Sequence, residues 1–196
     1  MPFQPTTLKR GGHMRLVISL VLVAMLAATS MAASLTSATQ ATIKSLSSLS
    51  GSKFDVAFMQ AFIPVHEEAV EIAMAATLNA DHTQLLKWNQ VVVERKNQQV
   101  RTMIAMLKAS GARPAKRNVG VQTASVKKMR QLKDAALEKA YIPLMASHLE
   151  QSAALAQLAS KKASRPELRA LAAKIVKQEN QDAATLRSWL KAWYKK

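Results

Sequence analysis

The feature that most constrains the fold of this chain is an internal repeat. Shifting the sequence by 83 positions places residues 41–109 over residues 124–192 without a gap, and 16 of the 69 aligned positions are identical. Conservative pairs such as Phe58 with Tyr141 fall in the same register. A repeat of this kind is one structural unit that cannot bury its apolar face alone. We therefore predict two similar units that pack against each other.

Each unit has the pattern of a helical hairpin. Apolar residues recur at steps of three and four, which is the period of an amphipathic α-helix. Polar turns at 79–83 and 164–167 divide each copy into two such stretches, and Ser164 is the predicted N-cap of the last helix. Short lead-in helices are expected around 45–51 and 127–133. Two hairpins should pack as a four-helix bundle, so the predicted fold class is all-α.

The first 33 residues have the form of a secretory signal peptide. Three basic residues precede the apolar run 16–28, and small residues follow at 30–33. An apolar run of about 13 residues is short for a membrane span, which needs roughly 20, so a membrane anchor is the weaker alternative. We predict that residues 1–33 are a leader, that residues 41–196 form a single helical domain, and that this domain is periplasmic or secreted.

Charge and cysteine content limit the classes of function. The chain has 28 Lys and Arg against 12 Asp and Glu, a net charge of +16, and no cysteine. Without disulfides, an exported domain depends on packing alone. The positive charge predicts either a well-solvated surface or binding to an anionic membrane, wall surface or polymer. Nucleic acid is not an expected partner, because the basic residues are not interleaved with clustered aromatic residues.

Polar residues interrupt the apolar stripes at positions that face the interior of the bundle. With 100° per residue, His148 lies at the centre of its stripe, whereas His66 lies at the edge of the equivalent stripe. The same phase directs Glu67 and Glu71 to solvent. The two histidines therefore differ in predicted burial although they occupy neighbouring positions of the repeat.

The partner helices carry further polar residues on their buried faces. Glu179 and Asp182 interrupt the stripe of the second copy, and their equivalents in the first copy are Lys96 and Gln99. Histidine and carboxylates from facing helices are the ligand types of metal sites in bundles. The alternative is that Lys96 takes the place of the cation in a buried ion pair, with His148 an ordinary core histidine. Under the first hypothesis the metal ligands are His148, Glu179, Asp182 and His66.

Three segments resemble the domain-of-unknown-function family 305 (DUF305). They are FDVAF at 54–58, FIPVHEEA at 62–69 and LRSWL at 186–190. The resemblance implies a ferritin-like four-helix fold in two copies over nearly all of the mature chain. Some members of that family are exported copper-binding proteins that use paired histidines and nearby methionines, so copper is the implied metal. The paired histidines of the family appear here as Val65-His66 and as His148-Leu149, so that each copy keeps one of the two.

The sequence leaves two functions open. The first is a non-enzymatic protein that binds copper for metal tolerance or storage. The second is a metal-free structural or binding module whose basic surface engages an anionic partner. An enzyme is not expected, because repeated Glu-x-x-His ligands, a nucleophile constellation and a phosphate-binding glycine loop are all missing from the sequence. The candidate partners are a metal ion, an anionic surface or polymer, and a second copy of the chain in a homodimer.

Overall fold

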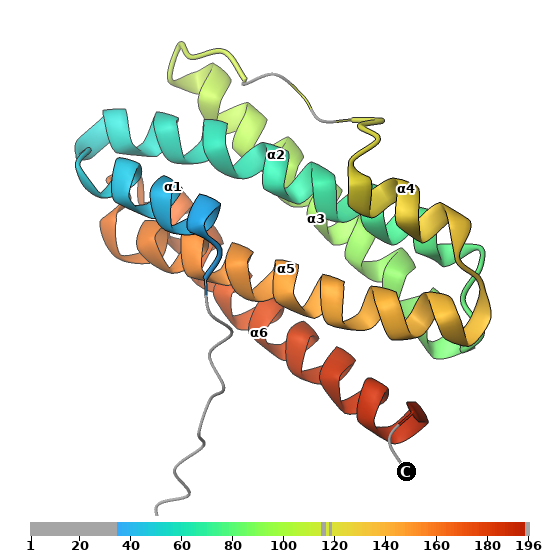
Figure 1. The fold of residues 1–196 in the computed structure, drawn as a ribbon. Helices are drawn as coiled ribbons and strands as arrows, with labels where there is room; N and C mark the ends of the chain where they lie inside the picture. Colours follow the sequence, from blue (N-terminus) through green and yellow to red (C-terminus); the bar gives the residue numbers. More distant parts are fainter. Residues whose placement is uncertain (1–34, 115–116, 118, 195–196) are drawn as a thin grey trace, which may run out of the picture. The chain divides into compact units, whose positions relative to one another are not determined.

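Helices make up nearly all of the described chain. The computed structural model describes residues 35–114, 117 and 119–194, and this part contains six helices and no strand (Figure 1). None of these helices is long and apolar enough to cross a membrane. The helices are α1 (Ser37–Ser47), α2 (Gly51–Thr77), α3 (Thr83–Ala109), α4 (Ala124–Gln131), α5 (Asp134–Lys162) and α6 (Pro166–Tyr194). They belong to one compact unit of the chain, Ala32–Lys196. The predicted leader lies outside the described residues.

The two halves repeat each other in structure as they do in sequence. The starts of α2 and α5 are 83 positions apart, and so are the starts of α3 and α6. Gly51 and Asp134, the first residues of α2 and α5, both have a positive φ, +58° and +51°. This left-handed conformation is easy for glycine and tolerated by aspartate. The predicted hairpins and lead-in helices are therefore present, although α1 and α4 begin earlier than expected.

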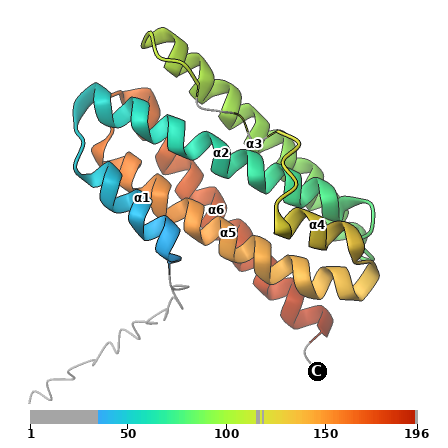
Figure 2. The ribbon, with the colours of Figure 1, turned by 45° about the horizontal axis from the view of Figure 1, so that its top comes forward.

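The helices pack as a bundle of two hairpins. Within the hairpins α2 packs on α3 and α5 on α6, while α2 and α5 pack on each other across the repeat. The short helices cover this α2–α5 pair, α1 near one end and α4 near the other (Figures 1 and 2). The all-α bundle expected from the sequence is confirmed.

Two apolar clusters fill the interior. The first, nearer α1, includes Leu46, Phe54, Phe58, Phe62, Met103, Leu107, Leu155 and Leu168. Its phenylalanines stack along one face of α2, with centroid distances of 6.0 Å and 4.9 Å between successive rings. The second cluster, nearer α4, includes Ile72, Leu85, Val126, Met129, Leu137, Tyr141 and Leu186. The core is thus divided along the bundle axis.

At the starts of α6 and α3, backbone N–H groups donate hydrogen bonds to a carboxylate of the opposite hairpin. Asp55 on α2 accepts hydrogen bonds from the backbone N–H groups of Ser164 (2.8 Å) and Arg165 (2.9 Å). Glu138 on α5 accepts from the backbone N–H of His82 at 2.7 Å. Asp55 and Glu138 occupy equivalent positions of the repeat. Ser164 was the predicted N-cap, but α6 begins two residues later, at Pro166, and the Ser164 hydroxyl donates to Asp55 at 2.6 Å.

Candidate functional site

A layer of buried polar side chains separates the two apolar clusters. Four residues of this layer, one from each long helix, lie between that helix's segments in the two clusters: His66 on α2, Lys96 on α3, Ser152 on α5 and Glu179 on α6. All four are at most 2% exposed. Polar groups at this depth are costly unless they are paired, so their mutual contacts determine what the layer can do.

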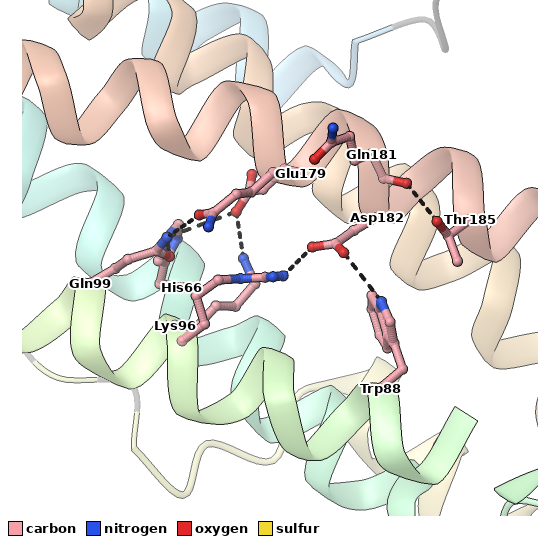
Figure 3. Close-up of polar contacts among 10 residues, drawn as sticks. His66, Trp88, Lys96, Gln99, Glu179, Gln181, Asp182 and Thr185 are labelled. Atoms are coloured by element: carbon pink, nitrogen blue, oxygen red, sulfur yellow. Dashed lines mark hydrogen bonds and ion pairs between the residues drawn. The ribbon is translucent and has the colours of Figure 1, made fainter. Parts of the chain in front are cut away.

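Lys96 and Glu179 form an ion pair at the centre of this layer. The Nζ atom of Lys96 lies 2.6 Å from Oε1 of Glu179, and the two side chains are 1% and 3% exposed (Figure 3). His66 lies close by, with Nε2 3.8 Å from the same carboxylate oxygen. The ammonium group therefore neutralises the buried carboxylate, as the ion-pair hypothesis predicted.

His66 is part of a hydrogen-bonded chain that leads away from the ion pair. The side-chain amide of Gln99 donates to Oε1 of Gln178 at 3.1 Å, so the Gln99 oxygen faces His66 and accepts from Nε2 at 2.9 Å. Burial, and then the charge of Lys96, lower the pKa of His66 well below its usual value. A neutral His66 with its proton on Nε2 presents a lone pair at Nδ1.

The burial of the two histidines is the reverse of what the sequence predicted. His66, expected at the edge of its stripe, is fully buried, while His148, expected at the centre, is partly exposed. The reason is that α2 is enclosed by several helices, so its buried arc is wider than its apolar stripe. His66 faces α3 and α6, whereas Nε2 of His148 donates to the carbonyl of Val65 at 3.0 Å, on the side of α2 that meets α5.

His148 lies beside an open hollow of the protein and contacts Val65. The hollow measures about 560 Å³ and lies between α1, α2 and α5, where Thr39, Glu68 and Gln151 also line it. Burial of the imidazole, together with the charge of Lys96, lowers the pKa of His148 to about 4. This histidine is therefore neutral at physiological pH.

Asp182 lies one turn along α6 from Glu179 and has other partners. Its carboxylate forms an ion pair with Arg95. It also accepts a hydrogen bond of 3.3 Å from Nε1 of Trp88 (Figure 3). Burial raises the pKa of Asp182 although Arg95 acts in the opposite direction. Of the four candidate ligands, the structure brings together His66 and Glu179 but leaves Asp182 and His148 at separate contacts.

Two glutamates that the helical phase directed to solvent are buried. Glu67 is 4% exposed and pairs with Arg117, and Glu71 is 9% exposed and accepts a hydrogen bond of 2.7 Å from the backbone N–H of Gly120. Both partners belong to the linker between the hairpins. The linker covers this face of α2, which the periodicity of a single helix cannot reveal.

The centre of the bundle offers few donors for a metal. Within the described residues, the buried polar atoms without a hydrogen-bond partner are Nδ1 of His66, Oγ of Ser152 and Oε2 of Glu179. In the same part of the chain, no three His, Asp or Glu side chains are grouped as a metal site would need. The positive charge of Lys96, which pairs with the Glu179 carboxylate, also repels a cation at this centre. The residues present do not fit a copper ion at this centre.

The methionines that could bind soft Cu(I) are distributed elsewhere. Met59 and Met103 belong to the first apolar cluster, and Met129 and Met145 to the second. Met74 is 55% exposed at the surface. Methionine at such buried positions fills irregular space in the core.

The lowered pKa values of His66 and His148 should make stability depend on pH. In the unfolded chain both titrate near pH 6.5, whereas their folded pKa values are lower, so the unfolded state binds more protons below about pH 7. We expect the free energy of unfolding to fall by about 3–4 kcal/mol between pH 7 and pH 5, roughly half of it from each histidine. Urea unfolding at several pH values measures this, and the slope should be shallower in His148→Gln. A slope unchanged by that substitution would contradict the assignment.

Comparison with known proteins agrees with this architecture. A Cu(I)-bound structure of CopM is 18% identical, with a TM-score of 0.64, and the alignment covers 71% of this chain and 97% of that one. The apo form of CopM is 19% identical, with a TM-score of 0.61, and the alignment covers 71% of this chain and 98% of that one. A DUF305 protein from Streptomyces coelicolor is 18% identical, with a TM-score of 0.64, and the alignment covers 70% of this chain and 91% of that one. At such identities the likeness shows the fold alone, and no curated protein sequence matches the chain.

The family model "Domain of unknown function (DUF305)" matches residues 23–107 and 138–196. The chain therefore belongs to the DUF305 family.

Proposed function

We propose that this protein is an exported, non-enzymatic binding module that needs no metal at its centre and engages an anionic partner through its basic surface. The observation that carries the proposal is the buried contact of 2.6 Å between Lys96 Nζ and Glu179 Oε1. An internal ammonium group occupies the place where a bundle of this kind would hold a cation. In this proposal the Lys96–Glu179 ion pair has a structural role, and the basic surface binds the anionic partner.

The distribution of charge supports an anionic partner. Five of the twelve acidic residues are buried, whereas Lys96 is the only buried lysine or arginine in the described part of the chain. The buried acids accept hydrogen bonds or pair inside the protein, as Asp55, Glu71 and Glu138 do. The surface is therefore more positive, relative to its acids, than the sequence composition indicates, and such a surface attracts polyanions.

Copper binding is the second candidate, favoured by the likeness to CopM, whose structures include Cu(I)- and Cu(II)-bound forms. His66 Nδ1 and Glu179 Oε2 are two buried atoms that face no partner among the described residues. A metal ion at these atoms would have to displace the ammonium group of Lys96. This requirement makes the two candidates distinguishable.

Calorimetric titration with Cu(I), Cu(II) and Zn(II) tests the proposal. We expect no binding of about micromolar or higher affinity by the protein that begins at Ala32. The variants His66→Ala and His148→Ala should give the same result, because neither removes a metal ligand. Tight binding by the native protein that either variant abolishes would establish the copper function instead.

Binding to dextran sulfate, a polyanion, tests the basic surface. Its affinity for the protein should weaken from low to high salt, and a salt-independent affinity would contradict an electrostatic partner site.

A further inference from the structure

Three segments of the chain meet at the end of the bundle where α2 and α6 finish and α4 leads into α5. The backbone N–H of Asp134, at the start of α5, donates to the carbonyl of Asn79 in the α2–α3 turn at 2.9 Å. The ring of His82, in the same turn, stacks on Trp193 near the end of α6 at 3.9 Å. Both ribbon views show these segments together (Figures 1 and 2). We call this region the Leu78 end, defined by Met74, Leu78, Lys127, Lys128, Arg130, Lys133, Lys139, Lys191 and Trp193.

The Leu78 end exposes apolar side chains. Leu78 is 89% exposed and Met74, one helical turn earlier, is 55% exposed. Trp193 is partly exposed in the last turn of α6. Burial of a leucine or methionine side chain away from water is favourable by about 1.5–3 kcal/mol, and tryptophan concentrates where apolar and aqueous phases meet. These side chains are suited to contact with an apolar phase.

Exposed cations lie on the helices that meet at this end of the bundle. On α4, Val126 and Met129 are buried in the core while Lys127, Lys128 and Arg130 are exposed. With Lys133, Lys139 and Lys191, which are also exposed, the Leu78 end carries six exposed cations, against exposed acids at Asp81 and Asp134. Lysine and arginine around a protruding leucine are typical of proteins that bind the surface of an anionic bilayer.

The opposite end of the bundle shows that charge alone does not single out this face. Lys53, Lys108 and Lys161 are exposed there, so that end is basic as well. It has no large exposed hydrophobic residue within the described part of the chain, because those residues are Met74, Leu78, Val91 and Val119. The combination of apolar and basic groups belongs to the Leu78 end.

We propose that the Leu78 end docks on a bilayer that contains anionic lipids. Leu78 and Met74 enter the boundary between headgroups and acyl chains, Trp193 lies at the level of the headgroups, and the cations of α4 bind the lipid phosphates. The inference rests on the proposed function, since it identifies the anionic partner and the face that meets it.

Vesicle binding tests this docking. The protein that begins at Ala32, which contains all six helices, is sedimented with vesicles of phosphatidylcholine alone or mixed with phosphatidylglycerol. We expect binding only to the mixed vesicles, with a blue shift of tryptophan emission. Replacing Lys127, Lys128 and Arg130 by glutamine should lower the partition constant by about fivefold for each charge, or roughly a hundredfold in total. Leu78→Ser should lower it by roughly tenfold without a change in charge.

The matched control is Lys53→Gln/Lys108→Gln/Lys161→Gln, which removes the same charge from the opposite end. We expect less than a twofold effect, with far-ultraviolet circular dichroism showing that every variant is folded. An equal loss in this control, or no loss in Leu78→Ser, would overturn docking through the Leu78 end. Salt-sensitive binding to dextran sulfate without binding to vesicles would overturn the lipid partner but leave the proposed function intact. Binding to neither would contradict the proposed function itself.

Discussion

Replacing Lys96 by methionine should lower the free energy of unfolding by about 3–5 kcal/mol, the usual cost of removing one partner from a buried ion pair. Methionine fills a similar volume, so the main effect is that the Glu179 carboxylate, 3% exposed, loses its counter-charge at 2.6 Å. The measurement is urea unfolding followed by circular dichroism at pH 8. At this pH His66 is neutral and cannot compensate, because its pKa is lowered.

Two further variants make this result interpretable. The double variant Lys96→Met/Glu179→Leu removes both charges and should regain most of the lost stability, because an apolar pair of similar volume is often as good as a buried ion pair. Arg101→Met removes a cation from an exposed ion pair on the same helix, with Glu94, and should change stability by less than about 1 kcal/mol. A Lys96→Met variant as stable as Arg101→Met would show that the carboxylate is not a buried charge.

The loss in Lys96→Met should also become smaller as the pH falls, which a purely steric defect would not do. The charge of Lys96 is one of the causes that lower the pKa of His66. Without it, His66 takes up a proton more readily, and its Nε2 lies 3.8 Å from Oε1 of Glu179. A protonated His66 then supplies the missing counter-charge. The deficit measured at pH 6 is therefore expected to be smaller than at pH 8, and His66→Gln in the same background should abolish this difference.

The helices and their order could be predicted because they depend on local and repeated signals. The 83-residue offset and the apolar period identified both hairpins, and apolar residues of α3 that follow this period, Leu85, Val92, Val100, Met103 and Leu107, are all buried. The candidate site was predicted in part. Lys96 and Glu179 face each other because equivalent positions of two related hairpins meet near the bundle axis.

Other features depend on neighbours that a single helix does not specify. The burial of His66 depends on α3 and α6, and that of Glu67 on Arg117 in the linker. A periodicity argument assigns a face to each residue but not the element that covers the face. The caps at Asp55 and Glu138 were missed although a signal existed, since both are acidic residues at equivalent positions near the start of otherwise apolar helices.

These two carboxylates connect the hairpins to each other. Asp55 on α2 accepts three hydrogen bonds from the turn before α6, while Glu138 on α5 accepts two from His82, before α3, and a further one of 2.5 Å from the hydroxyl of Tyr194. Burial raises the pKa of Glu138, but the hydrogen bonds from Tyr194 and His82 outweigh it and lower that pKa below its usual value. The pairing of hairpins is thus specified by polar contacts at both ends as well as by the apolar core.

Asp55→Ala should therefore lower the free energy of unfolding by about 3 kcal/mol, since it removes a buried carboxylate that accepts from two backbone N–H groups and one hydroxyl at the start of α6. Asp55→Asn keeps one acceptor oxygen and should cost less. The matched control is Asp81→Ala, an exposed acid in the α2–α3 turn, with an expected change within about 0.5 kcal/mol. Urea unfolding gives the totals, and amide hydrogen exchange should show the loss of protection concentrated in the first turns of α6. Equal effects of Asp55→Ala and Asp81→Ala would contradict the cap, whereas a loss spread evenly over all helices would assign Asp55 to the core.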